Sequence, residues 1–507
     1  MSDSPRSRRG IMALPAVVAF ALSITASWVP SFWHDEAATV SAVVRPLPKL
    51  LALLGNVDSV HGAYYLLLHP WVWLFGASEF SIRLPSAVAI AAAALGVTVI
   101  ANRLLGLTAG VGAGLVFALL PVASHFGMEA RSYAFVCALT TWATYVFIRA
   151  VDNDEHDDSW WLWVLYGALV FVAGVVFIYS LLIPAAHAVT LLVSGQSRRP
   201  VLRFVTSMAA VALALAPLVV IAHGQASQVS YLARTLPTAP WLAPFVWITP
   251  RLFDPQNLFT VLVVAIAVLL WSAVAYAVAR WLRGTRAADS PVRSPGSVGL
   301  VSLTLPWLFL PAVTLVNASA LIQPMYASRY VFYSMPALAI LVGFSLSLLP
   351  RRAYVATALV ALALLVLPIL VADRQMEAKD DLRVVASIIS DNKQAGDAII
   401  FRPPARRRME AAYAEGFAGL NDVLLEATPQ ESDTLTGVQY PLGELPDRLA
   451  GVDRVWLLEY KVLGEDGPSR TRAALAEAGF VPEWTWSDRH ADVILYVRAS
   501  SADRLRS

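Results

Sequence analysis

The feature that most constrains this chain is a series of long apolar segments, each close to the length that crosses a lipid bilayer. A spanning helix needs about 20 largely apolar residues, because the hydrocarbon core is about 30 Å thick. Of the 507 residues, 57% are hydrophobic and only 15% are charged, whereas soluble domains average about 45–50% and about 25%. We therefore expect an α-helical polytopic membrane protein with about eleven spans. The expected spans are residues 11–29, 84–101, 108–124, 133–148, 160–177, 180–193, 204–222, 258–278, 299–316, 330–349 and 354–372.

Basic residues in the short loops predict the orientation of these spans. Lys and Arg concentrate in cytoplasmic loops near spanning segments, and with eleven spans the arginine clusters all fall on one side. We therefore expect a multi-pass protein of the inner or plasma membrane with its N-terminus in the cytoplasm and its C-terminus outside. A cleaved signal peptide is the alternative for the first segment, but no clear small-residue cleavage site follows it. The arginines are Arg6, Arg8, Arg9, Arg198, Arg199, Arg203, Arg280, Arg283, Arg286, Arg293, Arg351 and Arg352.

Three regions face the exterior in this topology: the loop 223–257 and two longer polar regions. The first is the loop 30–83, and loops much longer than about 12–15 residues are usually functional. The second is the tail 373–507, in which residues 381–392 and 471–478 are predicted helices and residues 398–401, 454–460 and 493–498 are predicted strands. We therefore expect a transmembrane domain over 1–372 and a small extracytoplasmic α/β domain over 373–507. Three consecutive arginines of the tail are interpreted as a solvated basic face. They are Arg406, Arg407 and Arg408.

Composition excludes several other classes of protein. The formal net charge of +2 gives no global basic signal, so no nucleic-acid partner is expected. The single cysteine, Cys137, excludes an intramolecular disulfide framework and a cysteine-cluster metal site. We interpret Cys137 as a small buried hydrophobic residue.

An acidic pair follows the first apolar segment in the sequence Trp33-His34-Asp35-Glu36. Carboxylates beside a membrane are costly to desolvate, so they need a role or a partner. One interpretation is a general base, which must lie within hydrogen-bond reach of the proton that it removes. The alternative is a helix start, because acidic residues are favoured in a first helical turn.

Three further candidates lie in the same loop, namely Asp58, His61 and Tyr64. Asp58 and His61 are predicted to be neighbours on one helical turn. Their spacing is too unspecific to predict a metal site, so no metal ligand is assigned, although a divalent-cation requirement stays open. The alternative interpretation is an interfacial helix that lies on the bilayer.

Charged and aromatic residues also flank later segments on the outer side. Glu129, Arg131 and Tyr133 lie between the third and fourth segments, and Arg329 and Tyr330 open the tenth. A guanidinium group suits a phosphate because it offers a planar, bidentate donor fork. The alternative for each arginine is a side chain that snorkels from a helix end. Together these residue types supply what is needed to move a sugar from a lipid phosphate: an acid, a base and a phosphate ligand.

The order and spacing of several motifs resemble those of the GT-C polytopic glycosyltransferases. The resemblance is closest to the family 39 type, which groups protein O-mannosyltransferases with lipid A aminoarabinose transferases. It implies that Asp35 is the catalytic carboxylate with Glu36 beside it, and that Glu129, Arg131 and Arg329 occupy a vestibule. Relatives often carry His-Pro-Pro where this chain has His-Gly-Ala at 61–63. The motifs are W-H-D-E-A-A-T-V at 33–40, D-S-V-H-G-A-Y-Y-L-L-L-H-P-W at 58–71, S-I-R-L-P-S at 81–86, M-E-A-R-S-Y at 128–133, S-R-Y at 328–330 and A-G-D-A-I-I at 395–400.

The resemblance also implies the GT-C fold and a class of reaction. Its members take sugars from polyprenyl-phosphate donors, so we expect such a donor and a glycan, glycolipid or protein acceptor in the cell envelope. The Ala-, Val- and Arg-rich composition resembles that of actinobacterial proteins, which favours mannose or arabinose, and mannose is our first expectation. A flippase or transporter of lipid-linked sugars is the alternative, but no internal repeat of the transporter kind is evident. A further alternative is a degenerate relative whose outer domain only binds glycans or proteins.

Overall fold

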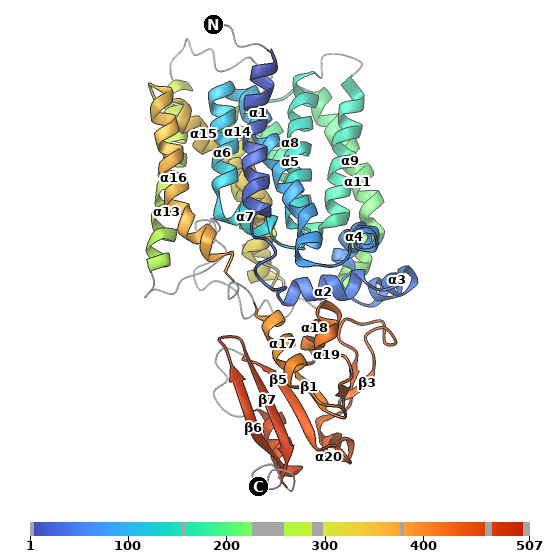
Figure 1. Cartoon of the computed structure of the whole chain (residues 1–507). Helices are drawn as coiled ribbons and strands as arrows, with labels where there is room; N and C mark the ends of the chain where they lie inside the picture. Colours follow the sequence, from blue (N-terminus) through green and yellow to red (C-terminus); the bar gives the residue numbers. More distant parts are fainter. Residues whose placement is uncertain are drawn as a thin grey trace. The chain divides into compact units, whose positions relative to one another are not determined.

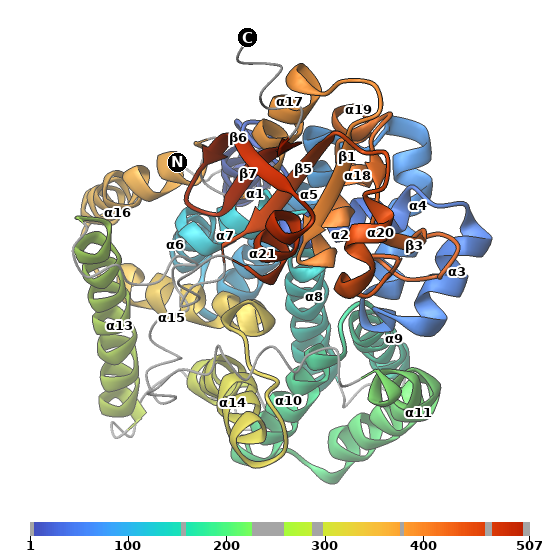
Figure 2. The same ribbon diagram turned by 90° about the horizontal axis from the view of Figure 1, so that it is seen from below.

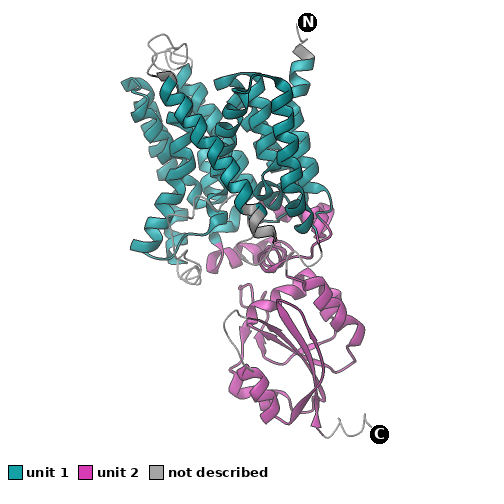
Figure 3. Ribbon diagram, turned by 90° about the vertical axis from the view of Figure 1, so that its left-hand side faces the viewer, with its two compact units in different colours: residues 1–27, 59–64, 83–374 teal, residues 28–58, 65–82, 375–507 magenta. Residues whose placement is uncertain are grey.

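The computed structural model describes residues 5–153, 159–225, 258–285, 298–375, 380–461 and 469–499. They form two compact units, which Figure 3 distinguishes by colour. Unit 1 comprises residues 1–27, 59–64 and 83–374, and unit 2 comprises residues 28–58, 65–82 and 375–507. The division after Arg374 lies next to the boundary expected at 372, but most of the first outer loop belongs with the C-terminal residues. Arg286 and Arg293, used for the orientation, and most of the loop 223–257 lie outside the described residues.

Apolar helices build unit 1 and run side by side in Figure 1. Eight helical segments of the described chain are long and apolar enough to cross a membrane, or nine if the bent pair α6 (Leu107–Leu119) and α7 (Pro121–Gly127) is one span. The multi-pass expectation is confirmed. Eleven spans were expected, two more than the nine obtained when the bent pair is counted as one span. The eight are α1 (Pro5–Ile24), α5 (Glu79–Leu105), α8 (Tyr133–Asp152), α11 (Arg198–Gly224), α13 (Leu258–Thr285), α14 (Leu300–Leu321), η6 (Ser328–Ser334) with α15 (Met335–Ser347), and α16 (Arg352–Ala372).

The two expected spans that are missing from this count are the fifth and the sixth, which form shorter helices. They are α9 (Trp160–Val176), and η3 (Ile178–Leu181) followed by α10 (Leu182–Val193). Helix α9 has 17 residues and would rise about 26 Å at about 1.5 Å per residue, which is less than the thickness of the hydrocarbon core. Both segments are helical and apolar as expected, but they are shorter than the eight longer helical segments.

Small residues allow the helices of unit 1 to approach closely around α6. A Cβ atom added at Gly114 would lie 2.7 Å from Pro15 Cβ of α1 and 2.0 Å from Thr98 Oγ1 of α5. A Cβ atom added at Gly343 of α15 would lie 2.7 Å from the backbone of Ala113. Helices in a membrane associate through such small-residue contacts, because no water-driven hydrophobic effect holds them together.

We expect Gly114→Ala to destabilise unit 1 by about 1–3 kcal/mol, because the added methyl group forces neighbouring helices apart. The measurement is thermal unfolding of the purified protein in detergent. Gly112→Ala on the same helix is the matched control, since its Cβ would lie 3.7 Å from the nearest atom, in ordinary contact with Leu346. Equal unfolding temperatures for the two variants would contradict the close packing at Gly114.

The segment 30–83, expected to be a long outer loop, is mostly helical. It contains α2 (His34–Val43), α3 (Leu47–Asn56), η1 (Ser59–His61) and α4 (Gly62–Phe75). Asp35 and Glu36 lie in the first turn of α2, where carboxylates interact favourably with the positive end of the helix dipole. The helix-start interpretation of the acidic pair is therefore correct as local structure, and it is compatible with a catalytic role.

The C-terminal residues of unit 2 form an α/β domain around a five-stranded sheet with the order β2-β1-β5-β7-β6. Figure 2 labels β1, β5, β7 and β6 of this sheet. Strand β1 is parallel to β2 and β5, and β7 is antiparallel to β5 and β6. Ile400, Leu457 and Ile494 are aligned across the three central strands and belong to the buried core. The elements of the sheet and its covering helices are β1 (Ala398–Arg402), β2 (Asn421–Asp422), β5 (Arg454–Tyr460), β6 (Phe480–Ser487), β7 (Ala491–Arg498), α17 (Leu382–Asn392) and α21 (Arg470–Glu477).

This domain confirms the predicted α/β character of the tail and adds four strands, of which β6 is the longest. The predicted strands correspond to β1, β5 and β7, and the predicted helices to α17 and α21. Strand β6 was not predicted because most of its residues are exposed and it contains Pro482, which is tolerated at a sheet edge. The smaller elements are β3 (Leu425–Ala427), β4 (Val438–Gln439), η8 (Pro404–Arg407), α18 (Arg408–Ala412), α19 (Ala414–Phe417), η9 (Leu442–Glu444) and α20 (Leu445–Arg448).

The interpretation of the three tail arginines as a solvated face is wrong. Arg406 and Arg407 are only 6% and 1% exposed. Arg406 Nη1 lies 3.1 Å from Asp380 Oδ2, and Arg407 Nη2 lies 3.3 Å from Asp422 Oδ1. Buried guanidinium groups require such partners, because an unpaired charge in the interior is costly. Cys137, in contrast, is buried as expected.

Candidate active site

The turn between α7 and α8 in unit 1 carries a buried charged cluster. His125 Nε2 lies 3.4 Å from Glu129 Oε2, and His125 Nδ1 lies 3.7 Å from Asp373 Oδ2. Glu129 is 2% exposed, and its Oε1 has no hydrogen-bond partner among the described residues. Pro121 ends α6 and starts α7 after a bend of 64°, because proline lacks an N–H and restricts the preceding residue. The bend turns the chain so that His125 meets both Glu129 and Asp373, the residue after α16.

Arg131 joins this turn to the first outer loop. Its Nη2 lies 2.9 Å from His61 Nε2, and its backbone N–H donates to Glu129 O at 2.9 Å. The His61 ring in turn stacks on Phe177, with 6.4 Å between ring centroids. Both Arg131 and His61 are buried. Two residues predicted separately from the sequence thus lie in direct contact.

Aromatic rings from three other segments of unit 1 pack together, and one of them, Phe177, is the ring on which His61 stacks. The Phe177 centroid lies 5.8 Å from that of Tyr133 and 5.4 Å from that of Tyr330. Tyr179 lies 5.4 Å from both Phe177 and Tyr330, and Arg329 Cζ lies 5.3 Å from the Tyr330 centroid. Such ring pairs are stabilising, and a guanidinium near an aromatic face gains cation–π attraction. We call this set the aromatic wall: Tyr133, Phe177, Tyr179 and Tyr330.

Tyr64, three residues after His61, packs against α8. Its ring contacts Phe135 of α8, with 5.6 Å between centroids, and the side chain is 1% exposed. Together the contacts place seven of the predicted site residues in unit 1. They are His61, Tyr64, Glu129, Arg131, Tyr133, Arg329 and Tyr330.

The remaining three predicted residues belong to unit 2. Glu36 is fully buried, and its Oε2 accepts a hydrogen bond from Trp33 N at 3.4 Å. Asp35, one position earlier, is half-buried. Asp58 accepts a hydrogen bond from Tyr65 OH at 2.7 Å. The predicted helical turn shared by Asp58 and His61 is wrong, because Asp58 has a left-handed φ of 61° and precedes η1.

Several contributors were not found from the sequence. His125 and Asp373 in unit 1, and Asp380 and Tyr413 in unit 2, make contacts with predicted residues or with the segment that contains them. The spacing of His125 and Glu129, four residues apart, was a usable local signal for a helical pair. The other contacts join distant positions and had no local signal. Among the described residues, no group of three or more His, Cys, Asp or Glu could hold a metal ion.

Burial lowers the pKa of His34, and Arg408 and Arg406 lower it further, to about 4; Asp35 and Asp380 act in the opposite direction. Arg408 Nη1 lies 3.2 Å from His34 Nε2, a contact that suits a neutral ring with an acceptor at Nε2. The folded protein therefore keeps His34 neutral at pH values where the unfolded chain, with an ordinary pKa of about 6.5, already binds a proton.

We expect acidification from pH 6.5 to 4 to destabilise unit 2, because in this window the unfolded state binds more protons at position 34 than the folded state. The contribution of a half-buried ring is on the order of 1–3 kcal/mol. His34→Gln keeps a neutral side chain with an acceptor and does not titrate. Thermal unfolding at pH 7.5 and 4.5 should show a smaller acid-induced loss in this variant than in wild type. Equal losses would contradict the assignment.

Comparisons with known proteins bear on both units. Residues 64–223 match the family model described as dolichyl-phosphate-mannose-protein mannosyltransferase. No curated protein sequence matches the chain.

Solved structures match over nearly the whole chain. ArnT from Cupriavidus metallidurans in the apo state matches with a TM-score of 0.58 at 14% identity, covering 97% of this chain and 98% of that chain. The same protein bound to undecaprenyl phosphate gives 0.56 at 14% identity, covering 96% and 98%. The archaeal oligosaccharyltransferase AglB from Archaeoglobus fulgidus, in complex with an inhibitory peptide and a dolichol-phosphate, gives 0.51 at 11% identity, covering 89% and 69%. At these identities the likeness concerns the fold.

Proposed function

We propose that this chain is a GT-C membrane protein of the glycosyltransferase family 39 type and that it transfers a sugar from a polyprenyl-phosphate donor to an acceptor of the cell envelope. Mannose is our first assignment for the sugar, because the matching family is described by a dolichyl-phosphate-mannose donor. Solved structures with this fold contain undecaprenyl phosphate and dolichol-phosphate, which supports a polyprenyl-phosphate donor here.

The observation that carries the proposal is the contact of Arg131 with His61, next to the aromatic wall and Arg329 in unit 1. A phosphate needs charged, bidentate donors, which two guanidinium groups supply. Aromatic rings supply an apolar surface for the rest of the donor. We assign donor-phosphate binding to Arg131 and Arg329, with His61 orienting the Arg131 guanidinium through their 2.9 Å contact.

We assign the general-base role to Asp35 and a positioning role to Glu36. The acceptor hydroxyl oxygen would form a bond to the anomeric carbon while the bond from that carbon to the phosphate oxygen breaks. The hydroxyl proton would pass to the Asp35 carboxylate, and the electron pair would leave with the polyprenyl phosphate. The burial of Glu36 and its hydrogen bond to Trp33 N support a role in holding the first turn of α2, on which Asp35 lies.

The test uses the full chain in lipid nanodiscs with radiolabelled undecaprenyl-phosphate mannose and, separately, undecaprenyl-phosphate arabinose. We expect free undecaprenyl phosphate to appear only when an envelope glycan extract is also present. A flippase would move the donor across a vesicle bilayer without consuming it. Mass spectrometry of envelope glycans after loss of the protein identifies the acceptor, and an unchanged glycan profile together with no donor consumption would refute transfer.

A further inference from the structure

We propose that Asp380, in the segment that leads into α17, is a positioning residue for the candidate base Asp35, because it caps the N-terminus of α2. This inference rests on the proposed function as far as catalysis is concerned, whereas the capping itself stands on geometry alone. It assigns a role to the C-terminal domain that the sequence left open.

Helix α2 has only part of a local cap: Glu36 Oε2 accepts from Trp33 N at 3.4 Å, and the N-cap side chain accepts nothing from the first turn. The first N–H groups of any helix lack partners within the helix, and a nearby Ser, Thr, Asp or Asn usually accepts from them. The residue before α2 is Trp33, whose side chain makes no capping hydrogen bond. Helix α21 of the same chain shows the ordinary solution, since its own N-cap Ser469 accepts from Arg472 N at 3.3 Å.

Asp380, 346 positions along the chain from His34, supplies the acceptor that the N-cap residue lacks. Its Oδ2 accepts a hydrogen bond from His34 N, the first residue of α2, at 3.2 Å. Its backbone oxygen accepts from Ser31 Oγ in the preceding segment. A carboxylate at this end of a helix also interacts favourably with the helix dipole. The residue that follows His34 is Asp35, so the cap holds the turn that carries the candidate base.

Asp380 is itself fixed by neighbouring side chains of the C-terminal domain. Arg406 Nη1 lies 3.1 Å from Asp380 Oδ2, and the side chains are only 7% and 13% exposed. The Arg406 guanidinium lies 3.6 Å from the centroid of the Tyr460 ring, and that ring stacks on His490 with 6.4 Å between centroids. The carboxylate therefore has little freedom to move away from His34 N.

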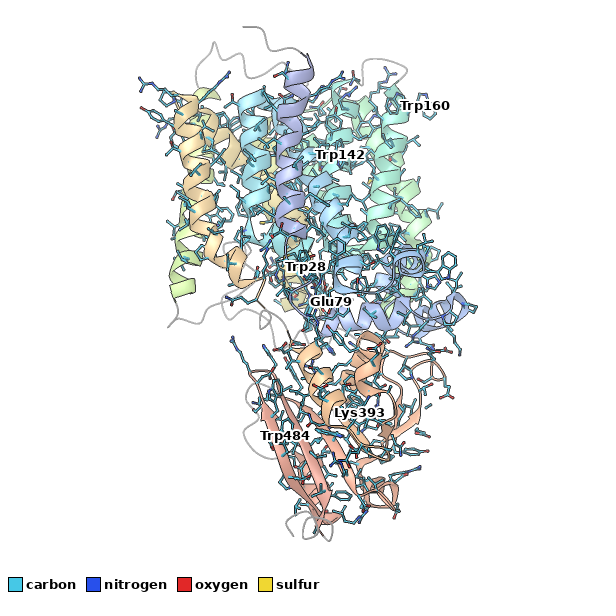
Figure 4. The ribbon with its side chains drawn as sticks, in the orientation of Figure 1. Trp28, Glu79, Trp142, Trp160, Lys393 and Trp484 are labelled. Carbon is cyan, nitrogen blue, oxygen red and sulfur yellow. The ribbon has the colours of Figure 1, made fainter. Side chains whose placement is uncertain are left out.

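A second contact holds the same segment. Tyr413 OH accepts a hydrogen bond from Phe32 N at 2.8 Å and donates to Glu79 Oε1 at 2.8 Å. Glu79, labelled in Figure 4, also accepts from Arg383 Nε of α17 at 3.2 Å. The backbone of residues 31–34 is thus attached to the C-terminal domain at both ends. Catalytic side chains must be held within fractions of an ångström of the productive position, and this attachment supplies that restraint for Asp35.

The experiment combines hydrogen exchange with kinetics on the full chain in nanodiscs, with undecaprenyl-phosphate mannose as the probe donor. In Asp380→Ala we expect backbone amides of residues 33–37 to exchange at least about tenfold faster, kcat to fall about 10- to 100-fold and the donor KM to stay within about twofold. Asp380→Asn keeps an acceptor for His34 N and should restore part of both losses. Asp391→Ala, an exposed carboxylate of α17, is the matched control and should behave as wild type.

Unchanged exchange at 33–37 in Asp380→Ala would overturn the capping. Faster exchange with unchanged kcat, or a loss confined to KM, would overturn the positioning role. Tyr413→Phe retains the ring contact with Phe32 and loses the hydrogen bond, so it tests the second attachment if Asp380→Ala does not fold. If the wild-type protein transfers no sugar from the probe donors, that result would count against the proposed function. The hydrogen-exchange data would still show whether Asp380 caps α2.

Discussion

Replacing Asp35 with Asn is expected to lower kcat for sugar transfer by about 10³-fold, because a general base contributes about 10²- to 10⁴-fold. Asn has nearly the same shape as Asp but cannot accept the proton of the acceptor hydroxyl. Asp35 is half-buried in the first turn of α2, so the loss of its charge should cost little stability. The measurement is single-turnover release of undecaprenyl phosphate in nanodiscs, with donor affinity determined separately.

Two variants control this prediction. Glu36→Gln alters the neighbouring carboxylate, which is fully buried and hydrogen-bonded to Trp33 N. We expect it to lower the unfolding temperature and to reduce kcat far less than Asp35→Asn does. Asp391→Asn changes an exposed carboxylate and should be silent. If Asp35→Asn retains more than about a tenth of wild-type kcat, Asp35 is not the general base. If instead Glu36→Gln shows the larger loss, the two roles are reversed.

Replacing Arg131 with Met is expected to lower kcat/KM by about 10²- to 10³-fold, because it removes a charged donor that stabilises the leaving phosphate. The side chain is 6% exposed and in contact with His61. Arg131→Lys should recover only part of the activity, since an ammonium group keeps the charge and loses the planar fork. The measurement is the dependence of initial rate on donor concentration.

The matched control for Arg131 is Arg149, in the last turn of α8. Arg149 contacts Tyr145 on its own helix, with Nη1 3.2 Å from Tyr145 OH. Arg149→Met removes the same kind of charge and should leave kcat/KM within about twofold of wild type. Equal losses in the two variants would indicate a general effect of removing arginines from α8 and its flanking turn. A full loss in Arg131→Met with unaltered binding of undecaprenyl phosphate would remove Arg131 from phosphate binding.

Much of the candidate site in unit 1 was accessible from the sequence because its residues sit at the ends of apolar segments. Arg131 and Tyr133 precede and open α8, and Arg329 and Tyr330 open η6. A charge at such a place stands out against an apolar background, and its cost in a membrane requires an explanation. His125 did not stand out, because it lies inside an apolar segment and its second carboxylate partner, Asp373, is 248 positions away.

The sequence by itself determined the membrane class, the positions of the apolar helices and the main strands of the tail. These follow from local properties, namely the length of an apolar run and the alternation or clustering of buried residues. Only the tertiary structure decided which polar groups meet: His61 with Arg131, His125 with Asp373, and His34 with Asp380. The burial of Arg406 and Arg407, and the pairing of the edge strand β6 with β7, were likewise visible only in the tertiary structure. A buried polar group must find a partner wherever the fold brings one, and no local pattern records a partner hundreds of residues away.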